Sequence, residues 1–290
     1  MMKEWDLQTG PRGLRLRVCE WGTPEDGRLP IIILHGFLEQ GAVWDSVASH
    51  LPGRVVAPDM RGHGLSGHIG PGGFYHFWDY VPDVATLIDH LGGRVDLVGH
   101  SMGGGLAMLL CALRPEKVRR LVNIEGLGPL DAEGRDLDQA DKFVAAIREP
   151  PRHRLIRDIE EGVKRMRRWN PHLSPRFARF LVERITRPPE PGDDYQGTPT
   201  EGALIWTWDP LHRARSPVPF RALSFQQFLE RVKVPVLFIR GADSPFVLPD
   251  QAEREALIQD LRTSEVHGAG HMIHHQKPRE LAALIAEHLA

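Results

Sequence analysis

A serine lies at the centre of a Gly-x-Ser-x-Gly motif at residues 99–103, and its hydroxyl is the first candidate for chemistry. The motif follows a β-branched apolar run at residues 95–98 and precedes small and apolar residues from Gly103 to Leu113. A strand–turn–helix of this kind exposes a serine hydroxyl at a sharp turn, and the helix N-terminus beside it favours developing negative charge. Ser101 is therefore the candidate nucleophile, against the simpler interpretation that the motif is only a tight turn.

A serine hydroxyl needs a base and an oxyanion site before it can attack a carbonyl. His271 follows a short glycine-containing loop at residues 268–270, after the last expected strand, and is the candidate base. The backbone N–H groups of Phe37, beyond an apolar run at residues 30–34, and of Met102 are the candidate oxyanion donors. His35 is a candidate pocket residue, although a local hydrogen bond is its simpler role.

These groups require strands and helices that alternate along the chain. Residues 14–21 alternate apolar and polar side chains, which predicts a half-exposed strand paired with an earlier one. Two-sided apolar runs predict buried central strands at residues 30–34, 55–57, 95–98, 121–124 and 234–241. A short strand near residues 263–267 and a helix at 278–289 are expected at the end of the chain. Strands separated by helices imply right-handed crossovers and a mainly parallel sheet.

The pattern changes between residues 127 and 231. Helical spacing appears at residues 144–147, 156–166 and 177–185, no strand run appears, and residues 187–202 have loop composition. We therefore expect an α/β core formed by residues 1–126 and 232–290, with a helical cap at 127–231. Trp208, among loop-forming neighbours, is a candidate for the substrate pocket. The basic run between residues 152 and 187 is interpreted as a solvated helix face rather than an anion-attracting rim.

The chain resembles the α/β-hydrolases that carry a cap, and most nearly their serine hydrolase-like and esterase branch. The resemblance is carried by residues 34–37, 58–66, 99–103 and 268–271, within about 12–126 and 232–290. It implies an α/β-hydrolase fold, a mainly parallel sheet flanked by helices with an inserted cap. It also implies the roles of Ser101 as nucleophile and His271 as base. We interpret the glycine-rich turn that begins at Asp59 as structural.

The acid of the expected triad departs from the family pattern. The family usually has an aspartate three residues after the glycine that ends the penultimate strand; this chain has Ser244 there and Asp243 one residue earlier. The other position used in the fold is the end of the strand after the nucleophile helix, where Glu125 stands. A carboxylate at the tip of a buried strand needs a partner because its desolvation is costly. We favour Glu125 over Asp243 as the partner of His271, although Glu125 can also be an ordinary strand-end residue.

Composition argues against several other classes of protein. The chain has 36 Lys and Arg against 38 Asp and Glu, which disfavours a nucleic-acid or anionic-membrane binder. Cys19 and Cys111 are its only cysteines, so no disulfide framework or cysteine metal cluster is expected. His271, His274 and His275 lack convincing further ligands, and we expect no metal and no cofactor. Without a signal peptide or membrane-spanning run, a cytoplasmic monomer or homodimer is expected.

The sequence thus predicts a serine hydrolase that cleaves small-molecule carboxylic esters with small to medium acyl groups, through an acyl-enzyme intermediate. Two alternatives stay open. One is hydrolysis of a C–C bond, a lactone or a thioester on the same triad. The other is a ligand-binding relative of the hydrolases with little turnover, because one fold hosts many functions.

Overall fold

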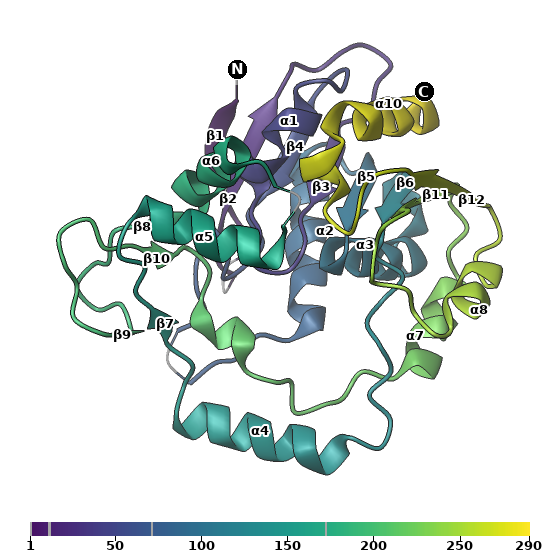
Figure 1. Ribbon diagram of the computed structural model, residues 1–290. Coiled ribbons are helices and arrows are strands. Elements are labelled where there is room, and N and C mark those ends of the chain that lie inside the picture. Colours follow the sequence, from purple (N-terminus) through teal and green to yellow (C-terminus); the bar gives the residue numbers. More distant parts are fainter. Residues whose placement is uncertain (1, 11–12, 71, 172) are drawn as a thin grey trace.

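Eight strands of the computed structural model form one sheet in the order β1-β2-β4-β3-β5-β6-β11-β12 (Figure 1). The structure describes residues 2–10, 13–70, 72–171 and 173–290. The strands are β1 (Lys3–Gln8), β2 (Arg15–Trp21), β3 (Ile31–Leu34), β4 (Val55–Pro58), β5 (Val95–His100), β6 (Val118–Ile124), β11 (Val236–Gly241) and β12 (Leu261–Val266). Pairing is antiparallel between β1 and β2 and between β2 and β4, and parallel across the rest of the sheet.

Helices cover both faces of this sheet. The α-helices of the first and last parts of the chain are α1 (Asp45–Ala48), α2 (Tyr80–His90), α3 (Met102–Leu113), α8 (Gln251–Ala256), α9 (Ile273–Gln276) and α10 (Pro278–Leu289). Single-turn 3₁₀ helices are η1 (Gly41–Trp44), η2 (Phe77–Asp79) and η3 (Pro115–Lys117). One hydrophobic cluster joins α1 and α10 to the sheet, and a second joins α2 and α3 to its other face (Figure 1).

The buried central strands confirm the interpretation of the apolar runs. All residues of β3, β4 and β5 are buried, as expected for strands covered on both faces. The expected strand at residues 14–21 is β2, and its earlier partner is β1. The strand order, with parallel neighbours joined through helices, agrees with the α/β-hydrolase fold that the resemblance implies.

The insert, defined here as residues 127–231, lies between β6 and β11. Its helices are α4 (Asp136–Arg148), α5 (Ile159–Trp169), α6 (Pro175–Ile185) and α7 (Ala222–Leu229), with the 3₁₀ helix η4 (Pro210–Arg213). The expectation of no strand there is wrong. Four two-residue strands occur, β7 (His153–Arg154), β8 (Thr186–Arg187), β9 (Tyr195–Gln196) and β10 (Ile205–Trp206), which pair β7 with β9 and β8 with β10. Two residues are too few for any side-chain periodicity to show.

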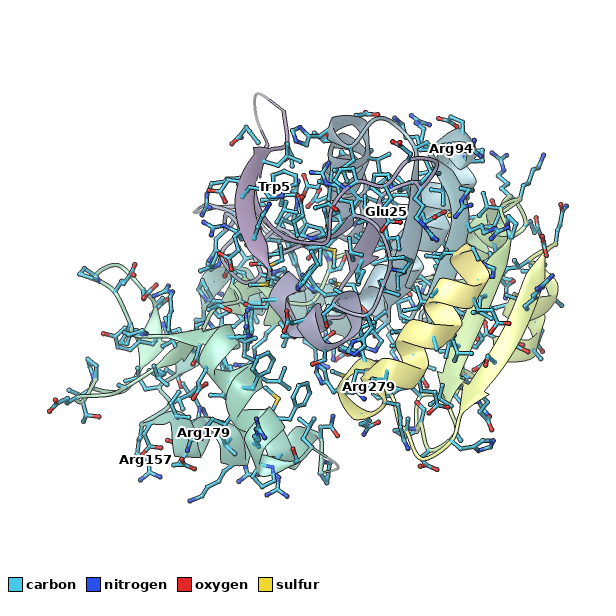
Figure 2. All side chains as sticks on the ribbon, turned by 90° about the horizontal axis from the view of Figure 1, so that it is seen from above. Trp5, Glu25, Arg94, Arg157, Arg179 and Arg279 are labelled. Carbon is cyan, nitrogen blue, oxygen red and sulfur yellow. The ribbon has the colours of Figure 1, made fainter. Side chains whose placement is uncertain are left out.

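The basic run of the insert lies on α5, α6 and the segments around them. Figure 2 shows Arg157 and Arg179 pointing outward from this part of the molecule. Arg157 and Arg165 both pair with Glu161, and Arg179 pairs with Glu160. Neighbouring carboxylates thus neutralise part of the run, the behaviour of an ordinary solvated helix face. Within the described residues, no helix is both long enough and apolar enough to cross a membrane.

A buried arginine fastens the beginning of the insert to the sheet domain. Arg254 on α8 has a fully buried side chain, and it donates to the Asp250 carboxylate at 2.8 Å and to the carbonyl oxygens of Leu127 at 2.8 Å and Pro129 at 2.9 Å. Both carbonyl groups precede α4, so the guanidinium fixes the direction in which the chain leaves β6. Removal of the guanidinium leaves these acceptors without their donor.

We expect Arg254→Met to lower the free energy of unfolding by about 3 kcal/mol, because the carbonyl groups of Leu127 and Pro129 lose a buried charged donor. Urea unfolding followed by circular dichroism measures this change. Arg262→Met, at an exposed position on β12, is the matched control and should change stability by less than about 0.5 kcal/mol. Equal stability of both variants would contradict the anchoring role of Arg254.

Candidate active site

Ser101 stands at the turn between β5 and α3 in a strained backbone conformation. Its φ is 51° and its ψ is −113°, and its N–H donates to the carbonyl oxygen of Ile124 at 2.8 Å. A positive φ costs energy in a residue with a side chain, and such strain collects at functional sites. The side chain makes no capping bond to α3, so the hydroxyl is not engaged in holding the helix.

The glycines of the motif are required by close packing of backbone around this turn. A Cβ at Gly99 would lie 2.5 Å from the carbonyl oxygen of Gly103, and one at Gly103 would lie 2.2 Å from that of Leu34. Both distances are far below van der Waals contact. The strand, the turn and the helix therefore approach one another only because these positions lack side chains.

His271 contacts Glu125 directly. The imidazole Nδ1 lies 2.6 Å from Oε2 of Glu125, and the carboxylate also accepts hydrogen bonds from Ser244 Oγ at 2.6 Å and from the Gly241 N–H at 2.8 Å. The Glu125 side chain is 2% exposed. A carboxylate with three donors is well placed to stay charged and to hold Nδ1 of an imidazole in its protonated form.

The electrostatics of this pair follow from burial and hydrogen bonding. Burial raises the pKa of Glu125, but the hydrogen bonds from His271, Ser244 and Gly241 outweigh burial, and the pKa lies below its ordinary value. Burial lowers the pKa of His271, and the contact with Glu125 opposes it only in part. The imidazole is therefore neutral at neutral pH, which is the form that accepts a proton.

Asp243, the alternative acid, points elsewhere. It is exposed, and its backbone N–H donates to the carbonyl oxygen of Ala269 at 2.9 Å. Among the described residues its carboxylate makes no hydrogen bond with His271. Ser244, which occupies the usual position of the family's aspartate, instead donates to Glu125. The geometry thus pairs His271 with Glu125, and the catalytic role of that carboxylate is a proposal taken up below.

The structure brings the loop of His271 to the nucleophile turn through the residue that precedes Ser101. Nε2 of His100 lies 2.9 Å from the carbonyl oxygen of His271, and the two rings have centroids 4.8 Å apart. Over the described residues no hydrogen bond joins the Ser101 hydroxyl to the His271 imidazole. Catalytic hydrogen bonds are often loose before substrate binds, so a side-chain rotation or the substrate itself has to complete this contact.

The loop after β3 presents the first candidate oxyanion donor. Leu38 has a φ of 62°, and its N–H donates to Nε2 of His63 at 3.2 Å. The N–H groups of Phe37 and Met102 donate to no other group of the described part of the chain. Phe37 is 50% exposed. Two free N–H groups beside the serine turn suit an oxyanion, and their use as the oxyanion hole stays a prediction.

The structure places the two candidate pocket residues, His35 and Trp208, in different surroundings. His35 is fully buried, Nε2 accepts from the Met60 N–H at 3.0 Å, and Nδ1 lies 2.7 Å from the Gly36 carbonyl oxygen. Burial lowers the pKa of His35 to about 4. Both ring nitrogens contact backbone groups, which is the simpler role expected of His35, and its fully buried ring does not line a pocket. Trp208 is 9% exposed and packs edge-on against His153, and its place in a substrate pocket stays a prediction.

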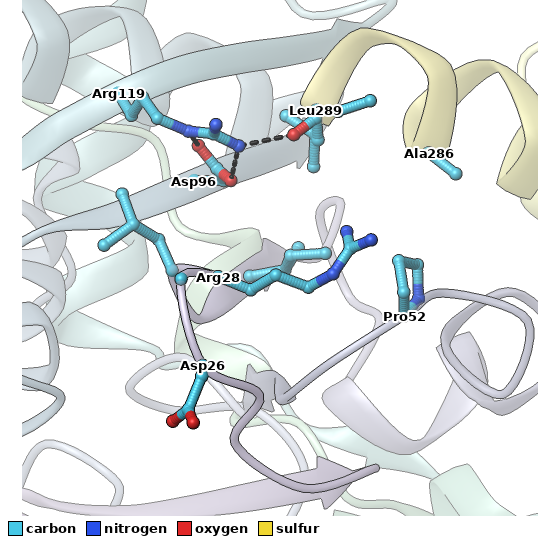
Figure 3. A pocket seen from close by; sticks show the side chains of 11 residues that line it. Asp26, Arg28, Pro52, Asp96, Arg119, Ala286 and Leu289 are labelled. Carbon is cyan, nitrogen blue, oxygen red and sulfur yellow. Dashed lines mark hydrogen bonds and ion pairs between the residues drawn. The ribbon is translucent and has the colours of Figure 1, made fainter.

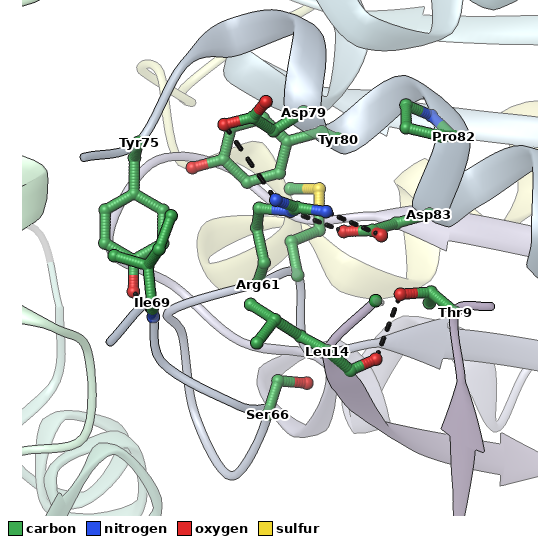
Figure 4. Close-up of polar contacts among 12 residues, drawn as sticks. Thr9, Leu14, Arg61, Ser66, Ile69, Tyr75, Asp79, Tyr80, Pro82 and Asp83 are labelled. Atoms are coloured by element: carbon green, nitrogen blue, oxygen red, sulfur yellow. Dashed lines mark hydrogen bonds and ion pairs between the residues drawn. The ribbon is translucent and has the colours of Figure 1, made fainter. Parts of the chain in front are cut away.

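The glycine-rich turn at residues 58–66 is structural, as its composition indicated. The Asp59 carboxylate accepts from the N–H groups of Gly41 at 2.7 Å and Leu65 at 2.8 Å. Figure 4 shows Arg61 of this turn facing Asp83 of α2, with Nε–Oδ2 and Nη2–Oδ1 distances of 2.7 and 2.9 Å. The turn is thus tied to η1 at one end and to α2 at the other.

Sequence reasoning missed Glu39, which lies at the centre of a buried histidine cluster. Its carboxylate, the imidazole of His274 and the imidazole of His275 offer ligand atoms within 4.8 Å of one another, so they are the residues that suit a metal ion. The sequence suggested His271, His274 and His275 as a possible metal-binding group, but His271 contacts Glu125 instead. In the structure Glu39 hydrogen bonds with His274 at 2.9 Å.

A cavity of about 300 Å³ lies at the opposite edge of the sheet (Figure 3). It is lined by the starts of β3, β5 and β6 and by the end of α10, and Arg119 there binds Asp96 through two hydrogen bonds of 2.9 and 2.7 Å. Ligands of open α/β sheets bind outside the carboxyl ends of the strands. This cavity at the amino ends is therefore no part of the candidate site.

The sequence pattern of the alpha/beta hydrolase fold family matches residues 30–278, and the chain belongs to that family. A serine hydrolase-like protein of Danio rerio is 30% identical over 290 residues, which cover 94% of this chain and 85% of the relative. A 3-hydroxybutyrate-oligomer hydrolase of Cupriavidus necator is 30% identical over 291 residues, covering 94% and 92%. The resemblance to serine hydrolases of the α/β-hydrolase superfamily is thus confirmed, and the chain is a hydrolase.

A solved structure extends this comparison. The thioesterase domain from the curacin biosynthetic pathway superposes with a TM-score of 0.82 at 30% sequence identity, covering 98% of this chain and 99% of that domain. The likeness therefore includes the insert as well as the sheet.

Proposed function

We propose that the protein is a serine hydrolase that cleaves small-molecule carboxylic esters with small to medium acyl groups. The observation that carries the proposal is the 2.6 Å contact between His271 and Glu125, in a loop that is held against the turn of Ser101. A histidine with a fixed tautomer, in a loop held near a strained and half-buried serine, is the arrangement that acyl transfer requires.

In the proposed reaction, Nε2 of His271 takes the proton of the Ser101 hydroxyl as Oγ attacks the ester carbonyl. The tetrahedral oxyanion accepts hydrogen bonds from the N–H groups of Phe37 and Met102. The imidazolium gives its proton to the departing alkoxide, which leaves as the alcohol. Water then attacks the acyl-enzyme, with His271 as base again, and the acid is released. Glu125 keeps the proton on Nδ1 throughout and stabilises the imidazolium.

A thioester is the second candidate substrate class. It is favoured by the similarity to a thioesterase domain over nearly the whole of both chains. The name of the Cupriavidus necator relative, 3-hydroxybutyrate-oligomer hydrolase, favours an oxygen ester. Parallel assays with p-nitrophenyl acetate to octanoate and with acyl thioesters of the same chain lengths distinguish the two, because the enzyme's kcat/KM ranks them directly.

Covalent labelling tests the nucleophile independently of any substrate. A fluorophosphonate probe should react with the folded protein at Ser101 alone, and peptide mass spectrometry locates the adduct. Prior unfolding should abolish labelling, since the reactivity depends on His271 being near. A folded protein whose Ser101 stays unlabelled would contradict the proposal.

The proposal also predicts a pH dependence. The base acts only when it is neutral, so kcat/KM should fall as pH drops through the pKa of His271. Burial holds that pKa below the ordinary 6.5, so the activity should be half-maximal at a pH below 6.5 and level above it. Stopped-flow or plate-reader rates with p-nitrophenyl acetate between pH 4.5 and 8.5 measure the profile. A midpoint above pH 6.5 would show that another group controls the acid limb.

We further propose that the insert acts as a cap over this site. Two contacts of the insert support this proposal. Nε2 of Gln40, in the loop after β3, donates to the Arg184 carbonyl oxygen at 2.7 Å, and Phe177 packs edge-on against His275 of α9. A small-molecule partner, a cytoplasmic location and a monomeric or homodimeric state stay predictions.

A further inference from the structure

Glu39 presents one carboxylate oxygen to two histidines of α9. Its Oε1 lies 2.9 Å from Nε2 of His274 and 3.5 Å from Nε2 of His275. The ligand atoms of the three residues all lie within 4.8 Å of one another. In a tetrahedral zinc site, where the bonds to nitrogen and oxygen are about 2.0 to 2.2 Å long, the ligand atoms lie about 3.3 Å apart. Small side-chain shifts are therefore enough to place one ion between these three atoms.

His275 is buried without a hydrogen-bond partner. Its side chain is 4% exposed, and within the described part of the chain neither ring nitrogen makes a hydrogen bond. Phe177 packs edge-on against the ring, with centroids 5.5 Å apart. A buried polar group that is left unpaired costs free energy, so an ordinary packing position here would favour an apolar side chain. A bond from Nε2 to a metal ion gives this histidine a partner.

The other two ligands are held in place by their neighbours. Oε2 of Glu39 accepts the Gly36 N–H at 2.9 Å and lies 3.1 Å from Nδ1 of His100, so Oε1 is the oxygen that faces α9. The indole of Trp44 stacks on the His274 ring, with centroids 4.3 Å apart and an interplanar angle of 7°. Contacts of this kind orient metal ligands before the ion arrives and strengthen its binding.

We propose that Glu39, His274 and His275 form a binding site for one divalent transition-metal ion, for which Zn²⁺ is the best-suited ion. Two imidazoles and one carboxylate are a donor set that zinc uses, whereas Mg²⁺ and Ca²⁺ prefer oxygen ligands throughout. On binding, the proton on Nε2 of His274 moves to Nδ1, so the ring stays neutral while Nε2 bonds to the ion. Water supplies the fourth ligand, as is usual where the protein supplies three.

The proposed ion links two parts of the chain that are distant in sequence. Glu39, in the loop after β3, is 235 residues from His274, which explains why the sequence indicated the histidines but not their carboxylate. The three ligands are separate from the proposed triad of Ser101, His271 and Glu125. The ion therefore fastens the loop after β3 to α9 and stabilises the fold, and this inference does not rest on the proposed function.

Zinc binding to the full chain tests the site. The protein is freed of metal with EDTA, the chelator is removed, and ZnCl₂ is titrated by isothermal titration calorimetry at pH 7. We expect one Zn²⁺ to bind per chain, and zinc at about 100 times its Kd should raise Tm by about 5 °C or more. The same concentration of MgCl₂ should leave Tm unchanged. A chain whose Tm does not respond to zinc would overturn the proposal.

His275→Leu is the most informative variant, because the fold loses no hydrogen bond with this side chain. The variant should bind zinc at least about 100-fold more weakly, a larger loss than replacing a residue that only supports the ligands. Without metal it should be at least as stable as the wild type, since it buries no unpaired nitrogen. A merely structural histidine would instead lose stability without metal and leave zinc binding unchanged.

The chain has 15 histidines, so zinc bound at the surface has to be told apart from zinc at this site. His267→Leu, at a side chain that is 87% exposed, is the matched control and should keep the zinc affinity of the wild type. Glu39→Gln keeps the size of the side chain and an oxygen for the Gly36 N–H, but it removes the charge and should weaken zinc binding like His275→Leu. Tight zinc binding that survives in either Glu39→Gln or His275→Leu would refute the site. An inactive protein that binds zinc as expected would refute only the proposed function.

Discussion

Replacing Ser101 with alanine is expected to lower kcat for p-nitrophenyl esters by roughly 10⁶-fold, the loss found when a serine nucleophile is removed from a triad. The reason is chemical rather than structural. The Ser101 hydroxyl makes no capping bond to α3, so its removal leaves every hydrogen bond of the turn in place. Alanine also has a Cβ, so the strain at φ 51° does not change.

Initial rates with p-nitrophenyl acetate to octanoate measure this effect, and a thermal melt of the variant shows that the fold is retained. Ser49→Ala, at an exposed position after α1, is the matched control and should keep wild-type rates. If Ser101→Ala still hydrolyses these esters at more than about a thousandth of the wild-type rate, another residue must be the nucleophile.

Glu125→Gln is expected to lower kcat by about 10³- to 10⁴-fold with little effect on folding. The Gly241 N–H needs an acceptor at the position of Oε1, so the amide oxygen stays there. The amide nitrogen then takes the place of Oε2, where it faces Nδ1 of His271 and donates to it. The imidazole must move its proton to Nε2, which is the wrong tautomer for a base toward Ser101. Replacing one carboxylate oxygen by an amide nitrogen therefore leaves Nε2 of His271 without the lone pair that accepts the proton of Ser101.

Asp243→Asn distinguishes this assignment from the alternative acid. Asp243 is exposed, and within the described chain its carboxylate makes no hydrogen bond with His271. The Asp243→Asn variant should therefore keep kcat within about twofold of the wild type, since substitutions at exposed positions usually have small effects. The two variants should be compared for kcat, KM and thermal stability with one ester. A large loss in Asp243→Asn together with a mild effect of Glu125→Gln would transfer the role to Asp243.

Much of the fold was predictable because the informative patterns are local. The two-sided apolar runs of β3, β4 and β5 indicated buried parallel strands, and the glycines around Ser101 indicated a tight turn before a helix. Glu125 was favoured as the partner of His271 because the resembled fold also uses the end of this strand for its acid, and because a carboxylate at the tip of a buried strand needs a partner.

The remaining features depend on contacts between distant parts of the chain. Glu39 and His100 are 61 residues apart, and His100 and His271 are 171 apart, so no spacing in the sequence shows that they meet. The role of His35 stayed open between pocket and local hydrogen bond, because the sequence does not show whether a histidine ring faces a ligand or, as here, the backbone of Met60. The paired strands of the insert are too short to leave a pattern.

On the proposed function, the hydroxyl of Ser244 constrains how the acid of the triad can change in evolution. Because Ser244 donates to Glu125 at 2.6 Å, an aspartate at residue 244 would set two carboxylates against each other beside one imidazole. Like charges that close raise each other's pKa and disfavour the double anion. If the acid moved between residue 125 and residue 244 one substitution at a time, the intermediate protein would have two competing carboxylates or none. The two residues therefore have to be substituted together.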